Sequence, residues 1–323
     1  MNVTRRSLPL LFAVPALKPA RAAAAAVRVG MLRFGSLSWE LDVMRTHGFD
    51  TAAGISVVPV EFAANQATQV ALQAGQVDAI VQDWLWVSRQ RGSGADWTFA
   101  PGSAALGAVM TPAGSAVGSM ADLVGKRLGV AGSPLDKSWL ILRGFCQKTM
   151  GFDIDAKAEK TFGPPPLLAQ QLAAGRLDAM LTFWPFAARA EAEGLRTVLN
   201  MADALAGLGI STGLPMLGYV FAESWATRER DATVGFLAAS QQARRLLGTS
   251  DGEWDRIAKL TGARDETELA QLRIWYRRGL PQDGAAREQN EAAKLYDILA
   301  AIGGADLVGA AAHLAPGTFW HAG

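Results

Sequence analysis

The sequence predicts an α/β protein of two lobes, each built on a mainly parallel sheet flanked by helices, with a two-strand hinge between them. Three observations lead to this prediction. The stretch LQAGQVDAIVQDWLW (72–86) returns as LAAGRLDAMLTFWPF (172–186), a hundred residues later. Strand-like and helix-like segments alternate around both copies, and an apolar segment follows each lobe-sized unit. A period of this length indicates duplicated domains, because solenoid repeats are only about 20–50 residues long.

The N-terminus has the three parts of a secretory signal peptide. Arg5 and Arg6 precede an apolar run over 8–17, and Ala-Arg-Ala follows at 20–22. We therefore predict a signal peptide over 1–22 and export to the periplasm. The apolar run is short for a membrane span, which needs about 20 residues. The paired arginines fit the twin-arginine route, although ordinary signals carry such pairs as well.

The first lobe is expected to begin with the order strand, helix, strand, helix, strand, which is typical of a parallel sheet with helices on its faces. The segment 55–62 alternates in polarity and is rich in β-branched residues, as strands are. The predicted elements are strands over 27–31, 55–62 and 77–81 and helices over 35–45 and 65–72.

The second copy repeats this order, which predicts a second lobe of the same design. Its register with the first copy is kept by Ser38-Trp39 and Ser138-Trp139, again a hundred residues apart. The predicted elements are strands over 127–131, about 156–162 and 177–182 and helices over 136–150 and 167–173.

Two apolar, strand-like segments predict the hinge. They lie at 104–111, after the first copy, and at 214–221, after the second. One would lead out of the first lobe and the other would lead back. The expected domains are therefore a discontinuous lobe one (27–108 and 217–323) and a continuous lobe two (109–216).

The rest of the chain is predicted to be helical. Amphipathic patterns cover 231–247 and 289–302, and Asp265–Glu268 reads as a capping box before a third helix. We expect these helices to pack back onto lobe one.

Composition excludes several classes of function. Lys plus Arg (31) nearly equals Asp plus Glu (30) and no long run of one sign occurs, so no nucleic-acid partner is expected. Cys146 is the single cysteine, which rules out an internal disulfide and predicts a buried apolar role. His47, His313 and His321 show no metal-ligand spacing, so neither metal nor cofactor is expected.

The doubled phrase predicts a binding cleft. In open parallel sheets ligands lie beyond the carboxyl ends of the strands. Each copy of the repeated phrase contains a buried strand whose carboxyl end is expected at that edge. Asp78 and Asp178 fall at the opposite ends of these strands, so we interpret them as residues of the helix-to-strand corner. The candidate ligand contacts at the cleft edge are Asp83 and Trp84 from one copy and Thr182, Phe183 and Trp184 from the other.

The first strand of each lobe ends at the same edge, where a glycine and a serine precede a helix. Phe34, Gly35 and Ser36 stand in the first copy and Gly132 and Ser133 in the second. Free N–H groups and the positive end of a helix favour an anionic ligand group, with the two hydroxyls as further donors. Ordinary N-capping by the same serines is the alternative interpretation.

The chain resembles the periplasmic substrate-binding proteins of the nitrate, sulfonate and taurine class of ABC importers. The resemblance runs from residue 27 to about 198 and continues more loosely through the C-terminal helices. It rests on MADLVGKRLGV at 120–130, on Gly132-Ser133, on the Ala-Gly-x-x-Asp-Ala phrase and on FWPF at 183–186.

This resemblance implies the two-lobed, type II-like fold of periplasmic binding proteins and capture of a small organic anion, sulfonate- or taurine-like, between the lobes. It also implies delivery to an ABC permease and its ATPase by a monomeric protein. Ser133 and its neighbours would bind the oxyanion of the ligand, and Phe183 occupies a position where relatives usually have tryptophan.

The sequence departs from the family pattern in two places. Relatives tend to have small residues where Asp83-Trp84 stand and a small or acidic residue where Trp184 stands. The tryptophan side chains would make the cleft wall bulkier than in relatives, and Asp83 would add a carboxylate. Both features favour an organic ligand that also carries a positive or aromatic part.

The sequence leaves two alternative functions open. An enzyme on the same bilobal fold, of the type that forms thiamine or menaquinone precursors, is disfavoured because the sequence has no cysteine cluster and no histidine dyad at the cleft edges. A binding protein for an aromatic or cationic solute is the second alternative.

Overall fold

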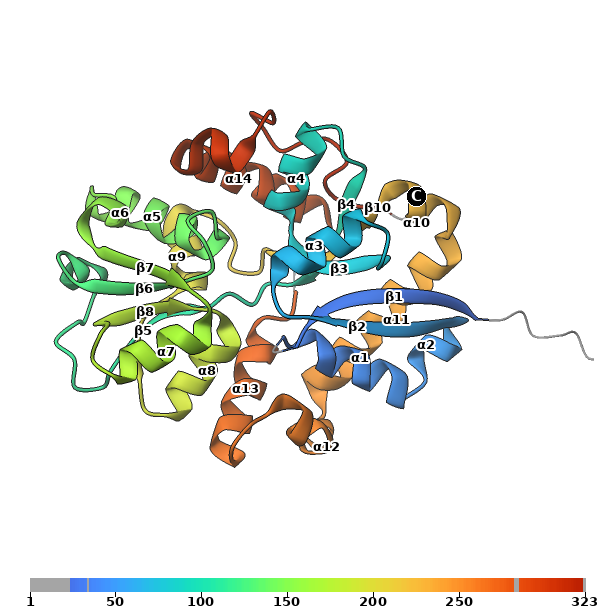
Figure 1. The fold of residues 1–323 in the computed structure, drawn as a ribbon, viewed down its shortest axis with the longest axis horizontal. Coiled ribbons are helices and arrows are strands. Elements are labelled where there is room, and N and C mark those ends of the chain that lie inside the picture. The colour runs from blue at the N-terminus through green and yellow to red at the C-terminus, as the bar shows by residue number, and fades with distance from the viewer. Residues whose placement is uncertain (1–23, 34, 282–284, 322–323) are drawn as a thin grey trace, which may run out of the picture.

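The computed structural model describes residues 24–33, 35–281 and 285–321. The predicted signal peptide (1–22) and Phe34 lie outside the described residues. Two five-stranded sheets stand side by side, each covered by helices, and this arrangement confirms the predicted two-lobed α/β fold (Figure 1).

The first sheet has the strand order β2-β1-β3-β10-β4. Strand β1 (Ala25–Leu32) pairs in parallel with β2 (Ile55–Phe62) and β3 (Ala79–Asp83). Strand β10 (Leu217–Ala222) is antiparallel to β3 and to β4 (Trp97–Ser103). Four strands therefore point the same way, and their carboxyl ends share one edge.

The second sheet, with the order β7-β6-β8-β5-β9, has the same design. Strand β6 (Arg127–Ala131) pairs in parallel with β7 (Glu159–Gly163) and β8 (Ala179–Thr182). Strand β5 (Ala108–Thr111) is antiparallel to β8 and β9 (Arg196–Asn200). The two copies of the repeated phrase thus end in β3 and β8, the central strands of separate sheets.

The chain passes between the sheets twice, through 104–107 and through 209–216. Each reversed strand, β5 or β10, follows a passage directly. Gly107 lies in the first passage, where a Cβ atom would stand 1.5 Å from the carbonyl oxygen of Thr182. A side chain at this position would collide with the backbone of β8, so the tight passage requires glycine.

Helices cover both faces of each sheet. On the first sheet, α11 packs against α1, α2, β1 and β2, and α12 packs against α1. On the second sheet, α7 contacts β6 and β8 while α5 packs on α9. The bounds are α1 (Leu37–Thr46), α2 (Phe49–Ala52), α3 (Asn65–Gln73), α4 (Trp84–Gly92), η1 (Met120–Leu123), α5 (Lys137–Met150), α6 (Ile154–Lys157), α7 (Pro165–Ala173), α8 (Trp184–Ala192), α9 (Met201–Leu208), α10 (Glu223–Arg228), α11 (Arg230–Thr249), α12 (Asp251–Thr261), α13 (Glu266–Arg278) and α14 (Ala285–Val308).

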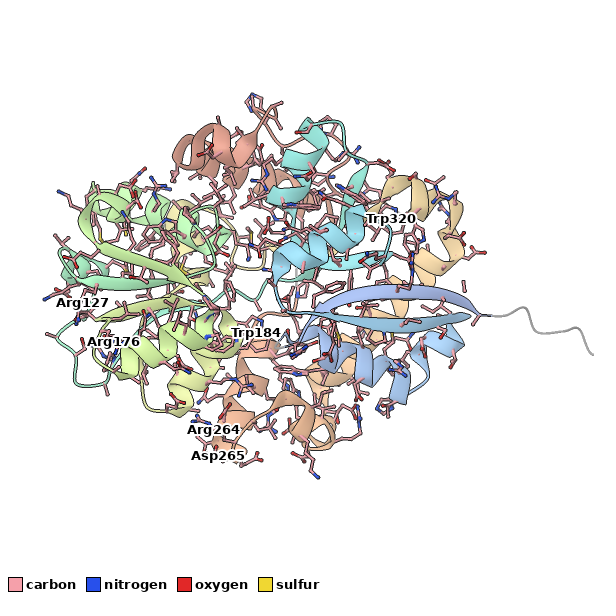
Figure 2. All side chains as sticks on the ribbon, viewed as in Figure 1. Arg127, Arg176, Trp184, Arg264, Asp265 and Trp320 are labelled. Carbon is pink, nitrogen blue, oxygen red and sulfur yellow. The ribbon has the colours of Figure 1, made fainter. Side chains whose placement is uncertain are left out.

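The aspartates of the repeated phrase hold the helix-to-strand corners, as predicted. Asp78 accepts hydrogen bonds from the backbone and the guanidinium of Arg28, with a shortest distance of 2.6 Å. Asp178 makes the same contacts with Arg127, with a shortest distance of 2.7 Å. Figure 2 shows Arg127 at the outer end of its sheet, remote from Trp184 between the lobes.

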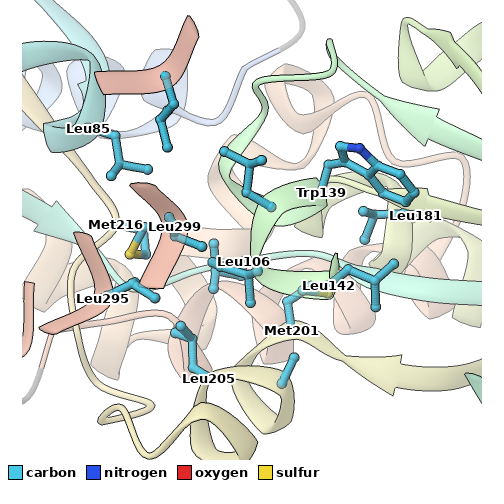
Figure 3. Packing of buried hydrophobic residues seen from close by; sticks show 14 of the residues in the cluster. Leu85, Leu106, Trp139, Leu142, Leu181, Met201, Leu205, Met216, Leu295 and Leu299 are labelled. Atoms are coloured by element: carbon cyan, nitrogen blue, oxygen red, sulfur yellow. The ribbon is translucent and has the colours of Figure 1, made fainter. Parts of the chain in front are cut away.

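The hydrophobic core continues from one lobe into the other. Leu85 on α4, Leu106 in the first passage, Leu205 on α9 and Leu295 on α14 belong to one cluster of buried residues (Figure 3).

Cys146 is buried as predicted, and burial raises the pKa of its thiol to about 12. Within the described part of the chain, no helix combines the length and apolarity that a membrane span requires.

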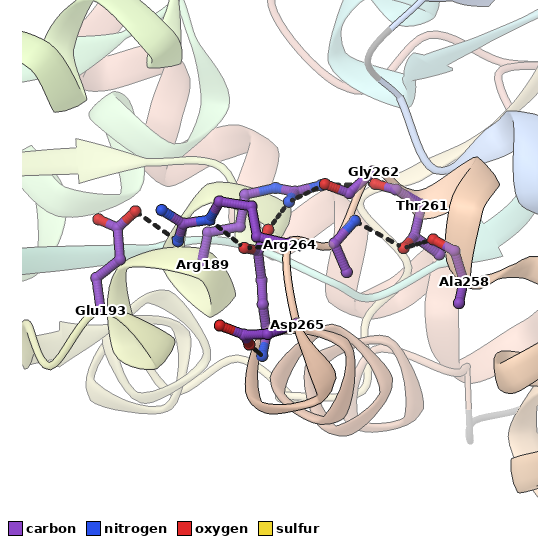
Figure 4. Close-up of polar contacts among 9 residues, drawn as sticks. Arg189, Glu193, Ala258, Thr261, Gly262, Arg264 and Asp265 are labelled. Carbon is purple, nitrogen blue, oxygen red and sulfur yellow. Dashed lines mark hydrogen bonds and ion pairs between the residues drawn. The ribbon is translucent and has the colours of Figure 1, made fainter.

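The C-terminal helices do not all pack on the first lobe, which corrects the prediction. Helix α13 packs mainly against α8 of the second sheet, and α14 lies against both α4 and α5. Polar contacts extend the α8 interface: Arg189 donates to the carbonyl oxygen of Thr261 at 2.7 Å, and Arg264 pairs with Glu193 at 2.7 Å (Figure 4). The amphipathic patterns predicted which face of each C-terminal helix is buried, but not which part of the protein that face packs against.

Candidate functional site

A cleft lies between the two sheets, at the edge where four helices begin. Helices α1 and α4 come from the first sheet, and α5 and α8 from the second. Their N-cap residues, Ser36, Asp83, Asp136 and Phe183, all line the cleft. Its volume of about 190 Å³ is below the range of roughly 300–1,000 Å³ for drug-sized ligands, so a compact ligand fits it.

Two of the four helix starts are capped by a side chain and two are not. Asp83 accepts a hydrogen bond from the backbone N–H of Trp86 at 2.8 Å, and Asp136 accepts one from that of Ser138 at 2.9 Å. Ser36 and Phe183 make no side-chain cap hydrogen bond. One uncapped positive helix end therefore faces the cleft from each sheet, a favourable place for negative charge.

Lys137 puts a buried cation into the same cleft. The residue is 8% exposed, and its ammonium group lies 5.8 Å from the centre of the Phe183 ring. This ammonium acts electrostatically on the adjacent Asp136, but no hydrogen bond or ion pair joins it to any other residue that the structure describes. A buried charge without such a partner is costly, so the cleft favours an anionic group at this point.

A second charged cluster lies on the side of the first sheet. Arg244 of α11 and Glu40 of α1 both line the cleft, with 3.5 Å between Nη1 and Oε2. The Glu40 carboxylate also accepts hydrogen bonds from the hydroxyls of Tyr276 at 3.0 Å and Tyr219 at 3.4 Å. Burial raises the pKa of Glu40, while Arg244 and the tyrosines oppose that shift.

Apolar side chains make up the remaining wall, and the first passage between the sheets forms part of it. The described apolar residues that line the cleft include Met31, Leu32, Leu37, Val81, Ala105, Leu106, Pro185, Phe186 and Leu217. An organic ligand with a short apolar part fits this lining better than a fully hydrated ion does.

Half of the predicted site residues lie together in the cleft. Gly35, Ser36, Asp83, Phe183 and Trp184 line it and come from both sheets. Trp184 is nearly buried and packs edge-on against Trp39 at 5.8 Å and Tyr276 at 6.1 Å, measured between ring centroids. Trp184, which follows β8 of the second sheet, therefore contacts α1 of the first lobe through Trp39 at the cleft wall.

Trp84 and Thr182 do not line the cleft. Trp84 is fully buried in the core, where its indole N–H donates to the carbonyl oxygen of Pro215 at 3.2 Å and its ring packs beside Phe319. Thr182 is buried at the end of β8, and its hydroxyl has no partner among the described residues. The structure therefore gives no support to the expected ligand contact through Trp84, because α4 begins at this residue and its side chain is buried outside the cleft lining.

Gly132 and Ser133 also lie away from the cleft lining, and both are exposed. The helix expected over 136–150 starts at Lys137 with Asp136 as its N-cap, so Ser133 stands three residues before the N-cap. Gly132 has a φ of 96°, a backbone conformation that favours glycine, at the start of the loop between β6 and α5. The oxyanion role expected for Ser133 therefore finds no support in its position.

Sequence reasoning missed four charged residues of the cleft: Glu40, Asp136, Lys137 and Arg244. The repeat itself contained a signal for two of them. Asp136 and Lys137 stand a hundred residues after Ser36 and Leu37, so the exact register would have placed them at the second helix start. Arg244 lies outside the repeat and had no comparable signal.

The structure is a two-lobed α/β fold with a cleft between its lobes. Residues 21–262 match the model of the NMT1-like family. The chain belongs to this family. A search among curated proteins finds no match.

Solved structures of the same fold include both binding proteins and an enzyme. The alkanesulfonate-binding protein SsuA from Xanthomonas axonopodis pv. citri, bound to MOPS, is 20% identical over 93% of this chain and 100% of its own, with a TM-score of 0.71. The periplasmic aliphatic sulphonate-binding protein SsuA from Escherichia coli is 18% identical over 92% of each chain, also with a TM-score of 0.71. The desulfurization enzyme DszB is 14% identical over 86% of this chain and 92% of its own, with a TM-score of 0.58.

Proposed function

We propose that the protein is the solute-binding component of an ABC importer and captures a small organic anion of the sulfonate type between its lobes. The observation that carries this proposal is the Lys137 ammonium, which lines the cleft, is buried and has no hydrogen-bond or ion-pair partner among the described residues. The acid group of a ligand would supply that partner. The alkanesulfonate-binding proteins of the same fold support the ligand class.

The arrangement of the donors suggests how the lobes would respond to the ligand. The acid group would meet Lys137 and the start of α8 from the second sheet and the start of α1, with Ser36, from the first. Contacts that form only when both lobes reach the ligand favour the closed state over an open one. Delivery to the permease then requires the lobes to separate again.

The location and the partners belong to the same proposal. Removal of residues 1–22 as a signal peptide would give a periplasmic protein that works as a monomer with a membrane permease and its ATPase. The paired Arg5 and Arg6 fit both the general and the twin-arginine export routes.

Binding fits the cleft better than catalysis does. None of the described residues that line it is a cysteine or a histidine, the side chains that most often serve as nucleophile or general base. DszB is too distant in sequence for its activity to carry over, and its likeness concerns the fold alone.

Titration calorimetry of the purified mature protein tests the proposal. Propane-1-sulfonate and MOPS are expected to bind, and propylammonium, which has a similar apolar part and the opposite charge, is expected not to bind. Mass spectrometry of the recovered sulfonates should find them unchanged. Binding of propylammonium alone would favour the cationic-solute alternative, and a converted sulfonate would favour the enzyme.

Acidification is expected to strengthen sulfonate binding. Burial raises the pKa of Asp136, the nearby Asp83 adds to the shift, and Lys137 opposes it. The folded protein therefore takes up a proton at a higher pH than free aspartate does, and each proton removes a negative charge from the cleft. Sulfonates stay ionised, so affinity should rise through a pH series that is lowered from neutral toward the raised pKa of Asp136.

Asp136→Asn is the matched variant for this pH series, because asparagine also caps helices. It should bind propane-1-sulfonate more tightly at the upper end of that series and show a smaller change with pH. An affinity of the wild type that falls on acidification would contradict the assignment of Asp136 to the ligand cleft.

A further inference from the structure

The Arg244 guanidinium is only partly engaged by the protein. Its Nη1 atom donates to the hydroxyl of Ser240 at 2.6 Å and lies 3.5 Å from Glu40. The guanidinium as a whole is paired with Glu40, and its Nε and Nη2 atoms donate no hydrogen bond of ordinary length to a residue in the described ranges. The side chain is 12% exposed and lines the cleft. One planar donor edge of a nearly buried cation therefore lacks a hydrogen-bond acceptor of ordinary length.

Gly102 leaves space open beside the Nη1 atom of Arg244. Gly102 and Gly218 lie on neighbouring strands and both line the cleft. A Cβ atom on Gly102 would stand 3.8 Å from Nη1 of Arg244 and 3.2 Å from the Cα of Gly218. Any larger residue here would narrow the approach to the guanidinium.

We propose that Arg244 forms a second acid-binding subsite and that the solute is an organic dianion, a sulfonate whose other end carries a carboxylate. Building on the proposed function, the sulfonate would meet Lys137 from the second sheet while the carboxylate meets the free edge of Arg244 from the first. The planar fork of a guanidinium matches a carboxylate in a bidentate way that an ammonium does not. A solute of this kind bridges the lobes with a charge at each end.

The three carboxylates of the cleft are compatible with such a solute. Asp83 and Asp136 cap the positive ends of α4 and α5, which offsets their charge. Glu40 is faced by Tyr219 of β10, Tyr276 of α13 and Arg244 of α11. Burial already raises the pKa of Glu40, and an arriving carboxylate beside Arg244 would favour its protonation further. Binding of the dianion should therefore be accompanied by proton uptake.

Two ligands of equal length separate this inference from the proposed function. In titration calorimetry, 3-sulfopropanoate should bind the wild type about tenfold or more tightly than propane-1-sulfonate, the gain expected from hydrogen bonds between charged groups. Its binding enthalpy should vary with the ionisation enthalpy of the buffer, which reports proton uptake. Equal affinity for both ligands would overturn the second subsite and leave the proposed function standing. Absence of binding by both would overturn the two together.

Variants of α11 and α1 identify the residue responsible. Arg244→Gln should lose the preference for 3-sulfopropanoate, and Arg244→Lys, which keeps the charge, should retain only part of it. Arg245→Gln, a change at the exposed neighbouring arginine, should keep the full preference. Glu40→Gln should bind 3-sulfopropanoate more tightly and without proton uptake from that residue. A preference that survives both Arg244 variants unchanged would overturn the proposal.

Discussion

Replacing Lys137 with methionine is expected to weaken the binding of propane-1-sulfonate by about thirtyfold or more, as measured by titration calorimetry. The figure corresponds to about 2 kcal/mol, within the range for a hydrogen bond to a buried charged group. Methionine keeps an unbranched apolar stem beside Phe183 and removes the ammonium. Thermal unfolding should change little, because no protein group in the described structure bonds to the lost charge.

Lys157→Met is the control for general charge effects, because Lys157 is exposed on α6 and lies outside the cleft lining. It should bind the sulfonate as the wild type does. Equal affinity of Lys137→Met and the wild type would show that the anion is held elsewhere.

Replacing Trp84 with alanine is expected to lower the free energy of unfolding by about 3–5 kcal/mol, the cost of truncating a large core aromatic. The ring is fully buried and its N–H donates to the Pro215 carbonyl, so truncation removes packing and leaves a buried acceptor without its donor. Urea denaturation followed by circular dichroism measures the loss. Val70→Ala, at a side chain that is 63% exposed, should leave the free energy of unfolding within about 0.5 kcal/mol.

The two repeat-equivalent tryptophans should therefore differ in what they affect. Trp184 lines the cleft and contacts Trp39 and Tyr276 across the lobes, so Trp184→Ala should weaken ligand binding. A Trp84→Ala protein that is as stable as the wild type but fails to bind the sulfonate would contradict the core position of Trp84.

The repeat predicted most of the fold because it aligned the strands and helices of the second lobe with those of the first. The strands that end in Asp83 and Thr182 appear as β3 and β8, and the alternation of strands and helices predicted the parallel parts of both sheets. The strands β4 and β9 were not predicted, since neither belongs to the repeated phrase. The placement of α13 and α14 depends on contacts far apart in the sequence, which no local pattern encodes.

The candidate site was only partly predictable for a related reason. The cleft edge follows from topology, so Gly35, Ser36, Asp83, Phe183 and Trp184 were found there. The helix expected over 136–150 begins at Lys137 in the structure, but the ligand contacts were expected at Gly132 and Ser133, which precede it, and not at the helix start itself. Arg244 reaches the cleft from α11, a helix that sequence patterns could place only in general terms.

A crystal structure of the mature protein with propane-1-sulfonate shows whether Lys137 holds the anionic group of the ligand, because the anomalous signal of the ligand sulfur fixes its position independently of the protein atoms. A sulfonate oxygen is predicted within about 2.7–3.2 Å of the Lys137 ammonium nitrogen, between the starts of α1 and α8. A sulfur peak outside the cleft, or inside it but beyond hydrogen-bond reach of Lys137, would contradict the account.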